Sequence, residues 1–217
     1  MPRRHRLWRY ALSLPGSVAF CLRYLPLRQA LRMPIFVSYT VARSRRGGKV
    51  RIEGPIRTGM ITIGLGWAPL FDWRRSRGVW DVPGEVVFEG PAEILHGTKL
   101  SVAGRLVLGR NVFVNAESCI SATREIVVGA DTMIAWHTLI MDSDAHSIGG
   151  QDPGEPVSIG ERVLIGARAT VLKGARLPSG TIVAASSCVT RRLRIEECDL
   201  VAGNPARVVR SGVSWQR

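Results

Sequence analysis

The chain has 217 residues, of which 46% are hydrophobic, so it is not a disordered chain and it is long enough to bury a substantial core. Its formal net charge is +13, but residues 1–80 carry sixteen of the 30 Lys and Arg and only two acids, Glu53 and Asp72. The basic charge therefore belongs to the N-terminal third, while the rest of the chain is close to neutral.

Residues 1–47 are predicted to form a basic helical extension. The first 46 residues contain ten Arg and no Asp or Glu, and prolines at 15, 26 and 34 are expected to break the segment into one or two helices. Within LPLRQALRMPIFV an apolar stripe lies beside an arginine stripe, which is typical of a helix in a membrane interface. The stripes are Leu25, Leu27, Leu31 and Ile35, and Arg23, Arg28 and Arg32.

Three roles for this extension stay open. It can associate peripherally with an anionic membrane through residues 1–46, cap the end of the domain that follows, or bind nucleic acid. No nucleic-acid partner is expected, because no helix-turn-helix, zinc or RRM-type signature accompanies the arginines. The uncharged run at 11–22 is too short to span a bilayer and lacks an A-x-A-like cleavage site. We expect a cytoplasmic protein, peripheral on the inner face of the membrane.

Residues 48–99 are predicted to open the main domain with short irregular strands. The segment WAPLFDWRRSRGVWDVPG at 67–84 is expected to be a loop or hairpin with three Trp. If exposed it would be an acceptor-binding platform, and if buried it would be a subunit contact. The four cysteines show no paired metal spacing, which favours reduced thiols.

From residue 100 to 210 aliphatic residues recur almost every six positions. There is a two-residue slip after Ile120 and an interruption at 141–158, and residues 211–217 form a tail. A period of six fits a solenoid in which each block is one short strand and a corner, with three blocks per coil and a little over four coils. The thirteen positions are Val102, Leu108, Val114, Ile120, Val128, Ile134, Ile140, Ile159, Ile165, Val171, Leu177, Val183 and Val189.

This pattern resembles the hexapeptide-repeat O-acetyltransferases that act on sugars and polysaccharides. The resemblance implies an all-β fold, a left-handed parallel β-helix solenoid following the N-terminal basic α-helical extension. Handedness comes from the resemblance, since the usual preference for right-handed crossovers predicts the opposite. It also implies a homotrimer, in which one subunit supplies the catalytic base and its neighbour completes the coenzyme A groove.

Three C-terminal stretches carry the cofactor side of the resemblance. VLIGARATVLKG, VAASSCVTRR and VAGNPARVV resemble the family's coenzyme A-binding segments, although Leu164 replaces a frequent Trp. The resemblance implies acetyl-CoA as acyl donor, with arginines pairing its phosphates. The implied binding residues are Gly166, Ala167, Ala184, Ala185, Thr190, Arg191, Arg192, Asn204, Pro205 and Arg207.

The interruption MDSDAHSI cannot continue a coil, so it is expected to loop outward, where functional residues concentrate. In the resembling enzymes a histidine on this excursion is the general base, and His146 matches it. Imidazole can accept a hydroxyl proton near neutral pH. Asp142 and Asp144 are assigned to the same site, where they would orient the ring, bind the acceptor or only shape the loop.

Asn115 and His137 are assigned to substrate binding, although a stacked exterior histidine is an alternative role for His137. No metal is expected, since a third histidine to join His137 and His146 is missing from the C-terminal coils. The expected activity is O-acetylation of a sugar hydroxyl, on a cell-surface polysaccharide or its precursor. The alternatives are N-acetylation of an amino sugar or small xenobiotic, and a non-catalytic membrane-docked scaffold.

Overall fold

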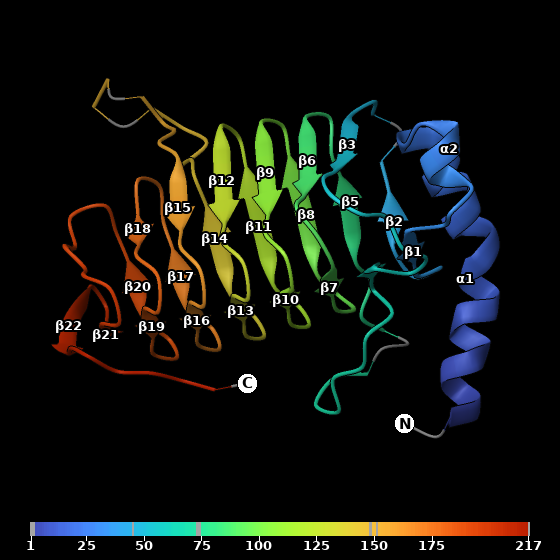
Figure 1. Ribbon diagram of the computed structural model, residues 1–217. Coiled ribbons are helices and arrows are strands. Elements are labelled where there is room, and N and C mark those ends of the chain that lie inside the picture. Colours follow the sequence, from blue (N-terminus) through green and yellow to red (C-terminus); the bar gives the residue numbers. More distant parts are fainter. Residues whose placement is uncertain (1–2, 45, 73–74, 148, 151, 217) are drawn as a thin grey trace.

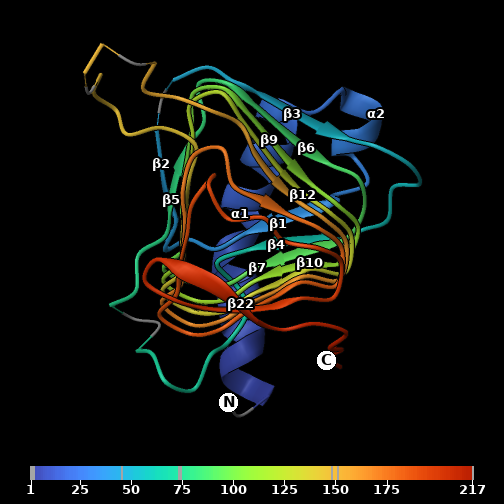
Figure 2. The same ribbon diagram turned by 90° about the vertical axis from the view of Figure 1, so that its left-hand side faces the viewer.

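The protein is a three-sided prism of parallel strands with a helix across one end. The computed structural model describes residues 3–44, 46–72, 75–147, 149–150 and 152–216. Figure 1 shows the prism from the side, with helix α1 (Arg3–Tyr24) and the short α2 (Leu27–Ala30) at the N-terminal end. Figure 2 looks along its axis and shows three walls that meet at three corners.

Each wall is one sheet, and successive strands in a wall belong to successive coils, except that β22 folds back on β21 as an antiparallel hairpin. Sheet A contains β1 (Ile35–Val37), β4 (Ile61–Ile63), β7 (Ala92–Ile94), β10 (Val112–Val114), β13 (Met133–Ile134), β16 (Leu164–Ile165), β19 (Ile182–Val183), β21 (Leu200–Gly203) and β22 (Ala206–Arg210). Sheet B contains β2 (Ala42–Arg43), β5 (Val79–Asp81), β8 (Lys99–Val102), β11 (Cys119–Ala122), β14 (Leu139–Met141), β17 (Thr170–Val171) and β20 (Cys188–Val189). Sheet C contains β3 (Lys49–Ile52), β6 (Glu85–Phe88), β9 (Arg105–Leu108), β12 (Glu125–Val128), β15 (Val157–Ile159) and β18 (Arg176–Leu177).

The core is a set of aliphatic columns that run along the prism axis. All thirteen positions of the six-residue repeat are at most 2% exposed, which confirms the predicted inward face. Along sheet A, for example, Val114, Ile134, Ile165 and Val183 are direct register partners in neighbouring coils. Burial of these side chains is the main force that holds the stacked coils together.

The two-residue slip in the repeat corresponds to a longer corner that recurs in the coils of 20 residues. Partners on sheet A are 20 residues apart between Val114 and Ile134, but 18 apart between Ile165 and Val183. The extra two residues lie at the corner from sheet B to sheet C, for example Ala103 and Gly104. A Cβ on Gly104 would lie 2.1 Å from the carbonyl oxygen of Arg124, so this tight corner requires glycine.

The solenoid begins earlier than predicted. The first strand, β1, starts at residue 35, and residues 48–99 supply β3 to β7, so the coils extend across the expected boundary at 47. Their opening is irregular in length, because register partners on sheet A are 26 residues apart between Ile35 and Ile61 and 31 apart between Ile61 and Ala92. The Trp-rich segment is not one loop, because Trp80 lies in β5, fully buried, with its ring 5.1 Å from that of Phe20. Trp67 is 47% exposed, and Trp73 lies outside the described residues.

Helix α1 closes the open edge of β1 with polar side chains spaced four residues apart. The Ser17 hydroxyl oxygen accepts a hydrogen bond from Val37 N–H at 2.9 Å, and the Cys21 thiol donates to Ile35 O at 3.4 Å. In the same stripe the Ser13 hydroxyl accepts from Tyr39 N–H, and the Arg9 guanidinium donates to Gly64 O. These bonds satisfy backbone groups that an edge strand otherwise leaves unpaired.

The expected apolar stripe across residues 25–35 does not lie on one helix. Leu25 is buried, α2 has only four residues, and Ile35 belongs to β1, which leaves Leu27 and Leu31 exposed. Pro15 lies inside α1 and does not break it. An interior proline costs a helix about 3 kcal/mol. Ser13 and Ser17, on either side of Pro15, hold the helix to the β1 segment through hydrogen bonds.

Candidate functional site

The predicted excursion leaves the prism at the corner between sheets B and C, directly after β14 (Figure 2). Its two arms pair at the base, where Ser143 and Gly154 form an isolated antiparallel bridge. Glu155 N–H also donates to Asp142 O at 2.8 Å. The chain then returns to β15, so the coils resume as the sequence predicted. The excursion is therefore a loop with a fixed base and an exposed tip.

Asp142 closes a coil corner and does not orient the histidine. The side chain is fully buried, and its two carboxylate oxygens accept hydrogen bonds from Thr123 N–H at 2.7 Å and Arg124 N–H at 2.8 Å. Both bonds reach back to the preceding coil. Of the roles considered from the sequence, shaping the loop agrees with these contacts, whereas no hydrogen bond joins Asp142 to His146 among the described residues.

Three ion pairs tie the excursion to neighbouring coils. Lys173 Nζ lies 2.6 Å from an Asp144 carboxylate oxygen, and Glu155 lies 3.2 Å from the Arg191 guanidinium. Asp152 pairs with Arg124. The pKa of Asp152 is lowered, first because its carboxylate accepts a hydrogen bond from Gly154 N–H and then because Arg124 lies beside it.

His146 lies on the exposed part of the excursion. It follows Ala145, which has a left-handed φ of 62°, and both residues are exposed. No hydrogen bond or ion pair connects His146 to another described residue of the same chain. A histidine used as a general base needs a substrate hydroxyl and an orienting group within about 3 Å, and no described residue of this chain supplies the orienting contact.

A groove of about 860 Å³ lies beside the base of the excursion. It brings together Asp144 and five of the predicted cofactor residues, so residues far apart in sequence share one cavity. The predicted residues that line it are Asp144, Thr190, Arg191, Arg192, Pro205 and Arg207. The sequence analysis missed Gly149, Leu172, Lys173, Leu193 and Ala206, although the quoted motif VLKG contains Leu172 and Lys173.

The other predicted cofactor residues lie elsewhere. Gly166, Ala167, Ala184 and Ala185 stack at the corner between sheets A and B, where Ser186 N–H donates to Ala167 O. Asn204 is exposed in the turn between β21 and β22. None of the five lines the groove. The motif VAASSCVTRR begins at this corner and ends at the groove, with strand β20 between them. Residues close together in the sequence are therefore separated by a strand in space.

Asn115 and His137 also lie at the corner between sheets A and B. The Asn115 side chain is buried and accepts a hydrogen bond from Ala116 N–H at 2.8 Å, which is a structural role. His137 is exposed, with its ring 5.0 Å from that of Phe71. Within one chain His137 and His146 lie beyond opposite ends of β14, so they do not share a site.

Glu117 is a charged neighbour of His137 that the sequence analysis missed. Burial opposes ionisation of this carboxylate, but hydrogen bonds from Ser76 and Lys99 outweigh it and hold the pKa of Glu117 below its usual value. The Lys99 ammonium lies 3.0 Å from the Glu117 carboxylate. With Phe71, these groups make the corner between sheets A and B a second polar surface.

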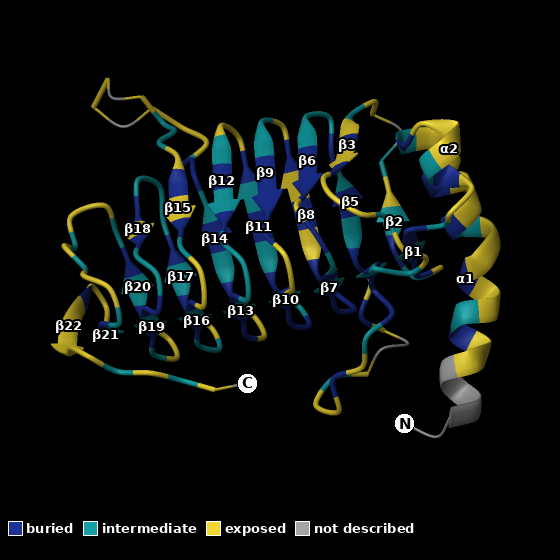
Figure 3. Ribbon diagram, in the orientation of Figure 1, coloured by how far each residue is buried: buried dark blue, intermediate teal, exposed yellow. Residues whose placement is uncertain are grey.

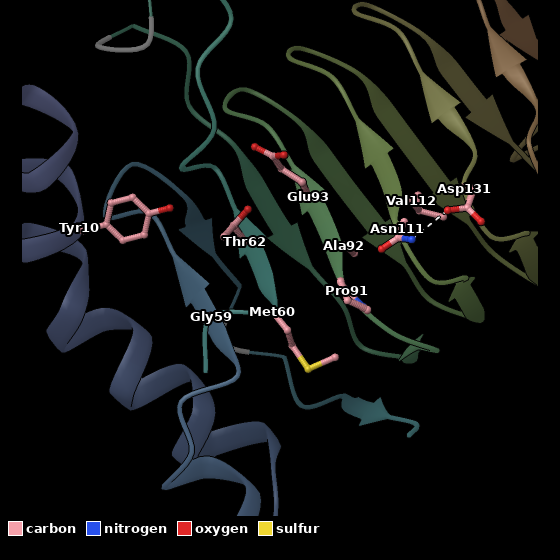
Figure 4. Close-up of a pocket in the computed structure, with 10 residues that line it drawn as sticks. All are labelled: Tyr10, Gly59, Met60, Thr62, Pro91, Ala92, Glu93, Asn111, Val112 and Asp131. Carbon is pink, nitrogen blue, oxygen red and sulfur yellow. Dashed lines mark hydrogen bonds between the residues drawn. The ribbon is translucent and has the colours of Figure 1, made fainter. Parts of the chain in front are cut away.

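Another hollow, of about 450 Å³, lies between α1 and sheet A (Figure 4). Tyr10 and Glu93 line it, and Asn111 donates a hydrogen bond to Asp131 at 2.9 Å. It contains none of the predicted site residues and no histidine.

The described residues hold no group of three His, Cys, Asp or Glu side chains arranged as a metal site. Neither helix in the described part of the chain has the length and apolarity needed to cross a bilayer.

Comparison with known proteins supports the resemblance. The chain is similar to WbbJ of Escherichia coli (strain K12), which is named as an O-acetyl transferase of lipopolysaccharide biosynthesis. The two are 32% identical over 130 residues, which cover 52% of this chain and 65% of WbbJ. The match therefore spans less than two thirds of that relative. No protein-family profile matches the chain.

Solved structures share the fold. The polySia specific acetyltransferase NeuO superposes with a TM-score of 0.60 and 18% identity, over 84% of each chain. A mutant of AntD, an N-acyltransferase from Bacillus cereus in complex with dTDP and coenzyme A, has a TM-score of 0.51 and 15% identity, over 82% of this chain and 80% of AntD. The predicted left-handed parallel β-helix fold is thus confirmed. The partial sequence match to WbbJ agrees with the resemblance to acetyltransferases.

Proposed function

Because this chain is related to the hexapeptide-repeat acetyltransferases, we propose that it transfers an acetyl group from acetyl-CoA to a sugar hydroxyl. The observation that carries the proposal is the groove at the foot of the excursion, which joins three arginines to the loop that bears His146. The acceptor would be a cell-surface polysaccharide or its precursor, as the named activity of WbbJ suggests.

His146 would act as general base. Its unprotonated ring nitrogen accepts the proton of the sugar hydroxyl while that oxygen attacks the thioester carbonyl carbon. The tetrahedral intermediate then collapses, the carbon–sulfur bond breaks, and the imidazolium returns the proton to the leaving thiolate. Transfer is direct, so no acyl-enzyme forms. General base catalysis of this kind contributes about 10²–10⁴ in rate.

The groove would hold coenzyme A. Arg192 and Arg207 are exposed and Arg191 is half-exposed, so all three can pair phosphate oxygens, and Thr190 and Pro205 line the same wall. Gly166, Ala167, Ala184, Ala185 and Asn204 would contact the cofactor only from a neighbouring subunit, since they do not line the groove of their own chain.

A homotrimer would bring these parts together. The outward faces of sheets A and C differ in chemistry. Sheet C carries a charged ladder in which Glu85 pairs with Arg105 at 3.4 Å and Arg105 with Glu125 at 2.9 Å, which suits solvent. Sheet A carries a half-buried apolar column along the same direction, which suits a subunit contact. The column is Met133, Leu164, Ile182 and Leu200.

In such a trimer the excursion of one subunit would lie beside the corner between sheets A and B of its neighbour. His146 would then face His137 and Phe71 of the neighbouring copy, so the acceptor would bind between subunits. Residues 1–46 would hold this cytoplasmic assembly at an anionic membrane surface, where a lipid-linked acceptor is made.

His146→Ala tests the catalytic step. We expect the thiol release rate with acetyl-CoA and a panel of oligosaccharides to fall by about 10²–10⁴, with the trimer mass and melting temperature unchanged. Full activity in this variant would refute the role of His146. Transfer to amines only would favour the N-acetyltransferase alternative, and no transfer by the wild type to any acceptor would favour a scaffold.

Leu164→Glu tests the assembly. Placing a charge in the apolar column is expected to give monomers without activity. The matched control is Arg105→Ala on sheet C, which should stay trimeric. A trimer that survives Leu164→Glu would place the interface on another wall.

A further inference from the structure

Helix α1 turns its polar stripe inward and its apolar side outward. The side chains of the inward stripe form hydrogen bonds with the first coils, at β1 and at Gly64. No other element covers the opposite face of α1 among the described residues. Figure 3 shows this face as exposed along most of the helix. The described residues include fourteen large exposed hydrophobic side chains, and eight of them lie between residues 7 and 31. They are Leu7, Trp8, Leu12, Leu14, Val18, Leu22, Leu27 and Leu31.

These side chains are too exposed to be explained by packing. Trp8 is 68% and Leu22 53% exposed, and Leu27 at the start of α2 and Leu31 directly after it are 64% and 72% exposed. A soluble monomer rarely leaves a continuous apolar patch of this kind without a partner. We call residues 7–31 on this side the end face.

The positive charge around the end face indicates which kind of partner binds there. Arg23, Arg28 and Arg32 are exposed beside the patch, and the first 46 residues contain no acid to balance them. Two copies meeting through this face would oppose arginine with arginine, which disfavours pairing. An anionic lipid surface instead accepts the apolar side chains below its headgroups and attracts the arginines at about 1 kcal/mol each.

We propose that the end face inserts into the headgroup layer of an anionic membrane, so that the prism stands upright on the lipid surface. In Figure 1 α1 lies across the end of the prism and crosses the direction in which the strands stack. A helix lying flat in the interface therefore points the coils away from the membrane. In the proposed trimer, where the prism axes are parallel, three end faces would bind the same surface and strengthen attachment through avidity.

This orientation sets the distance between the lipid surface and the excursion that carries His146. The conclusion drawn from that distance rests on the proposed function. On sheet B, β14 is the fifth strand from the helix end. Four strand spacings of about 4.8 Å and a helix diameter of about 10 Å place the excursion roughly 30 Å above the lipid. The acceptor hydroxyl would belong to a sugar several residues from its lipid anchor, so a lipid-linked oligosaccharide is favoured over a lipid carrying one sugar.

Vesicle co-sedimentation of the full chain tests the end face. The wild type should bind phosphatidylcholine vesicles that contain about one third phosphatidylglycerol, and binding should fall in high salt. Changing Trp8→Gln with Leu22→Gln should weaken binding by about tenfold or more. The control pair is Leu70→Gln with Val209→Gln, which are 69% and 58% exposed on other surfaces and should bind like the wild type.

Two results would overturn the proposal. If the Trp8/Leu22 variant binds vesicles as well as the wild type does, the end face is not the membrane-binding surface. The second result has three parts: the wild type does not bind vesicles, it has twice the mass of a trimer, and the same variant has the mass of one trimer. The end face would then be a contact between copies of the chain. Acetyl transfer to a soluble oligosaccharide should be unchanged in this variant, so failure of docking and failure of the proposed activity are measured separately.

Discussion

Lys173 and Asp144 form a 2.6 Å ion pair that joins the excursion to the next coil at the edge of the groove. Both side chains are partly buried, at 20% and 31% exposed, so solvent screens the pair less than it screens surface ion pairs. Lys173 Nζ also approaches Asp152 O at 3.5 Å, and thus reaches both arms of the loop. We infer that Lys173 is a positioning residue for the loop that carries His146.

Lys173→Met should therefore lower the proposed acetyl transfer by about tenfold, because the loop loses one of its three ion pairs to neighbouring coils, while the melting temperature changes by only a few degrees. The measurement is a double-mutant cycle with Asp144→Asn, using kcat/KM for acetyl-CoA-dependent thiol release. If the ion pair is the cause, Lys173→Met has little further effect in the Asp144→Asn background. Additive effects would show that the two side chains act separately.

Asp142 gives a prediction about stability. Asp142→Ala leaves Thr123 N–H and Arg124 N–H without their acceptor, and an unsatisfied buried donor costs about 1–3 kcal/mol. Urea unfolding should show this loss, with a smaller one for Asp142→Asn, whose amide oxygen still accepts one bond. The exposed Glu161→Ala serves as control and should stay within about 0.5 kcal/mol of the wild type.

The repeat was predictable because one physical rule applies to every coil. An inward position must be apolar, and all thirteen positions obeyed it. The two-residue slip appears in the predicted repeat because the six-residue spacing places Val102 and Ile120 in equivalent positions of neighbouring coils. In the structure the register partner of Ile120 is Leu100. With Leu100 in the column, each 20-residue coil has the same long corner.

The roles of the acids and the start of the prism could not be read from local patterns. Asp142 bonds to residues 18 and 19 positions earlier, so no motif of eight residues reveals its use. His137 and His146 are close in sequence, yet β14 separates them. In the N-terminal coils a 31-residue step from Ile63 to Ile94 hides the period, and α1 buries serines where an amphipathic pattern expects leucines.

That polar stripe gives a third prediction. Ser17→Ala removes the acceptor for Val37 N–H on the edge of β1 that α1 covers, so the N-terminal coil should lose about 1–3 kcal/mol. Leu14→Ala, on the outer side of the same helix, should be nearly neutral because Leu14 is 47% exposed. Amide hydrogen exchange of residues 35–39 measures the effect locally. Equal protection in both variants would mean that α1 does not seal this edge.

His96 is the buried titratable group from which a pH dependence follows. Its side chain has no exposed surface, and Ala68 N–H donates to its Nε2 at 3.4 Å, which requires an unprotonated Nε2. Burial, and then the nearby Arg9 charge, lower the pKa of His96 below its usual value. The unfolded chain therefore binds this proton more readily than the folded chain does.

Stability should consequently fall as the pH drops from about 6.5, the unfolded pKa, towards the lower folded pKa, and should be independent of this group above that window. His96→Asn removes the proton-binding difference, so its unfolding free energy should depend less on pH between 7.5 and 5.5, although it is lower throughout. Urea titrations at three pH values in this range measure the slope. The control Leu70→Gln changes an exposed side chain that binds no proton and should keep the wild-type slope. If His96→Asn also keeps it, another group sets the acid sensitivity of the fold.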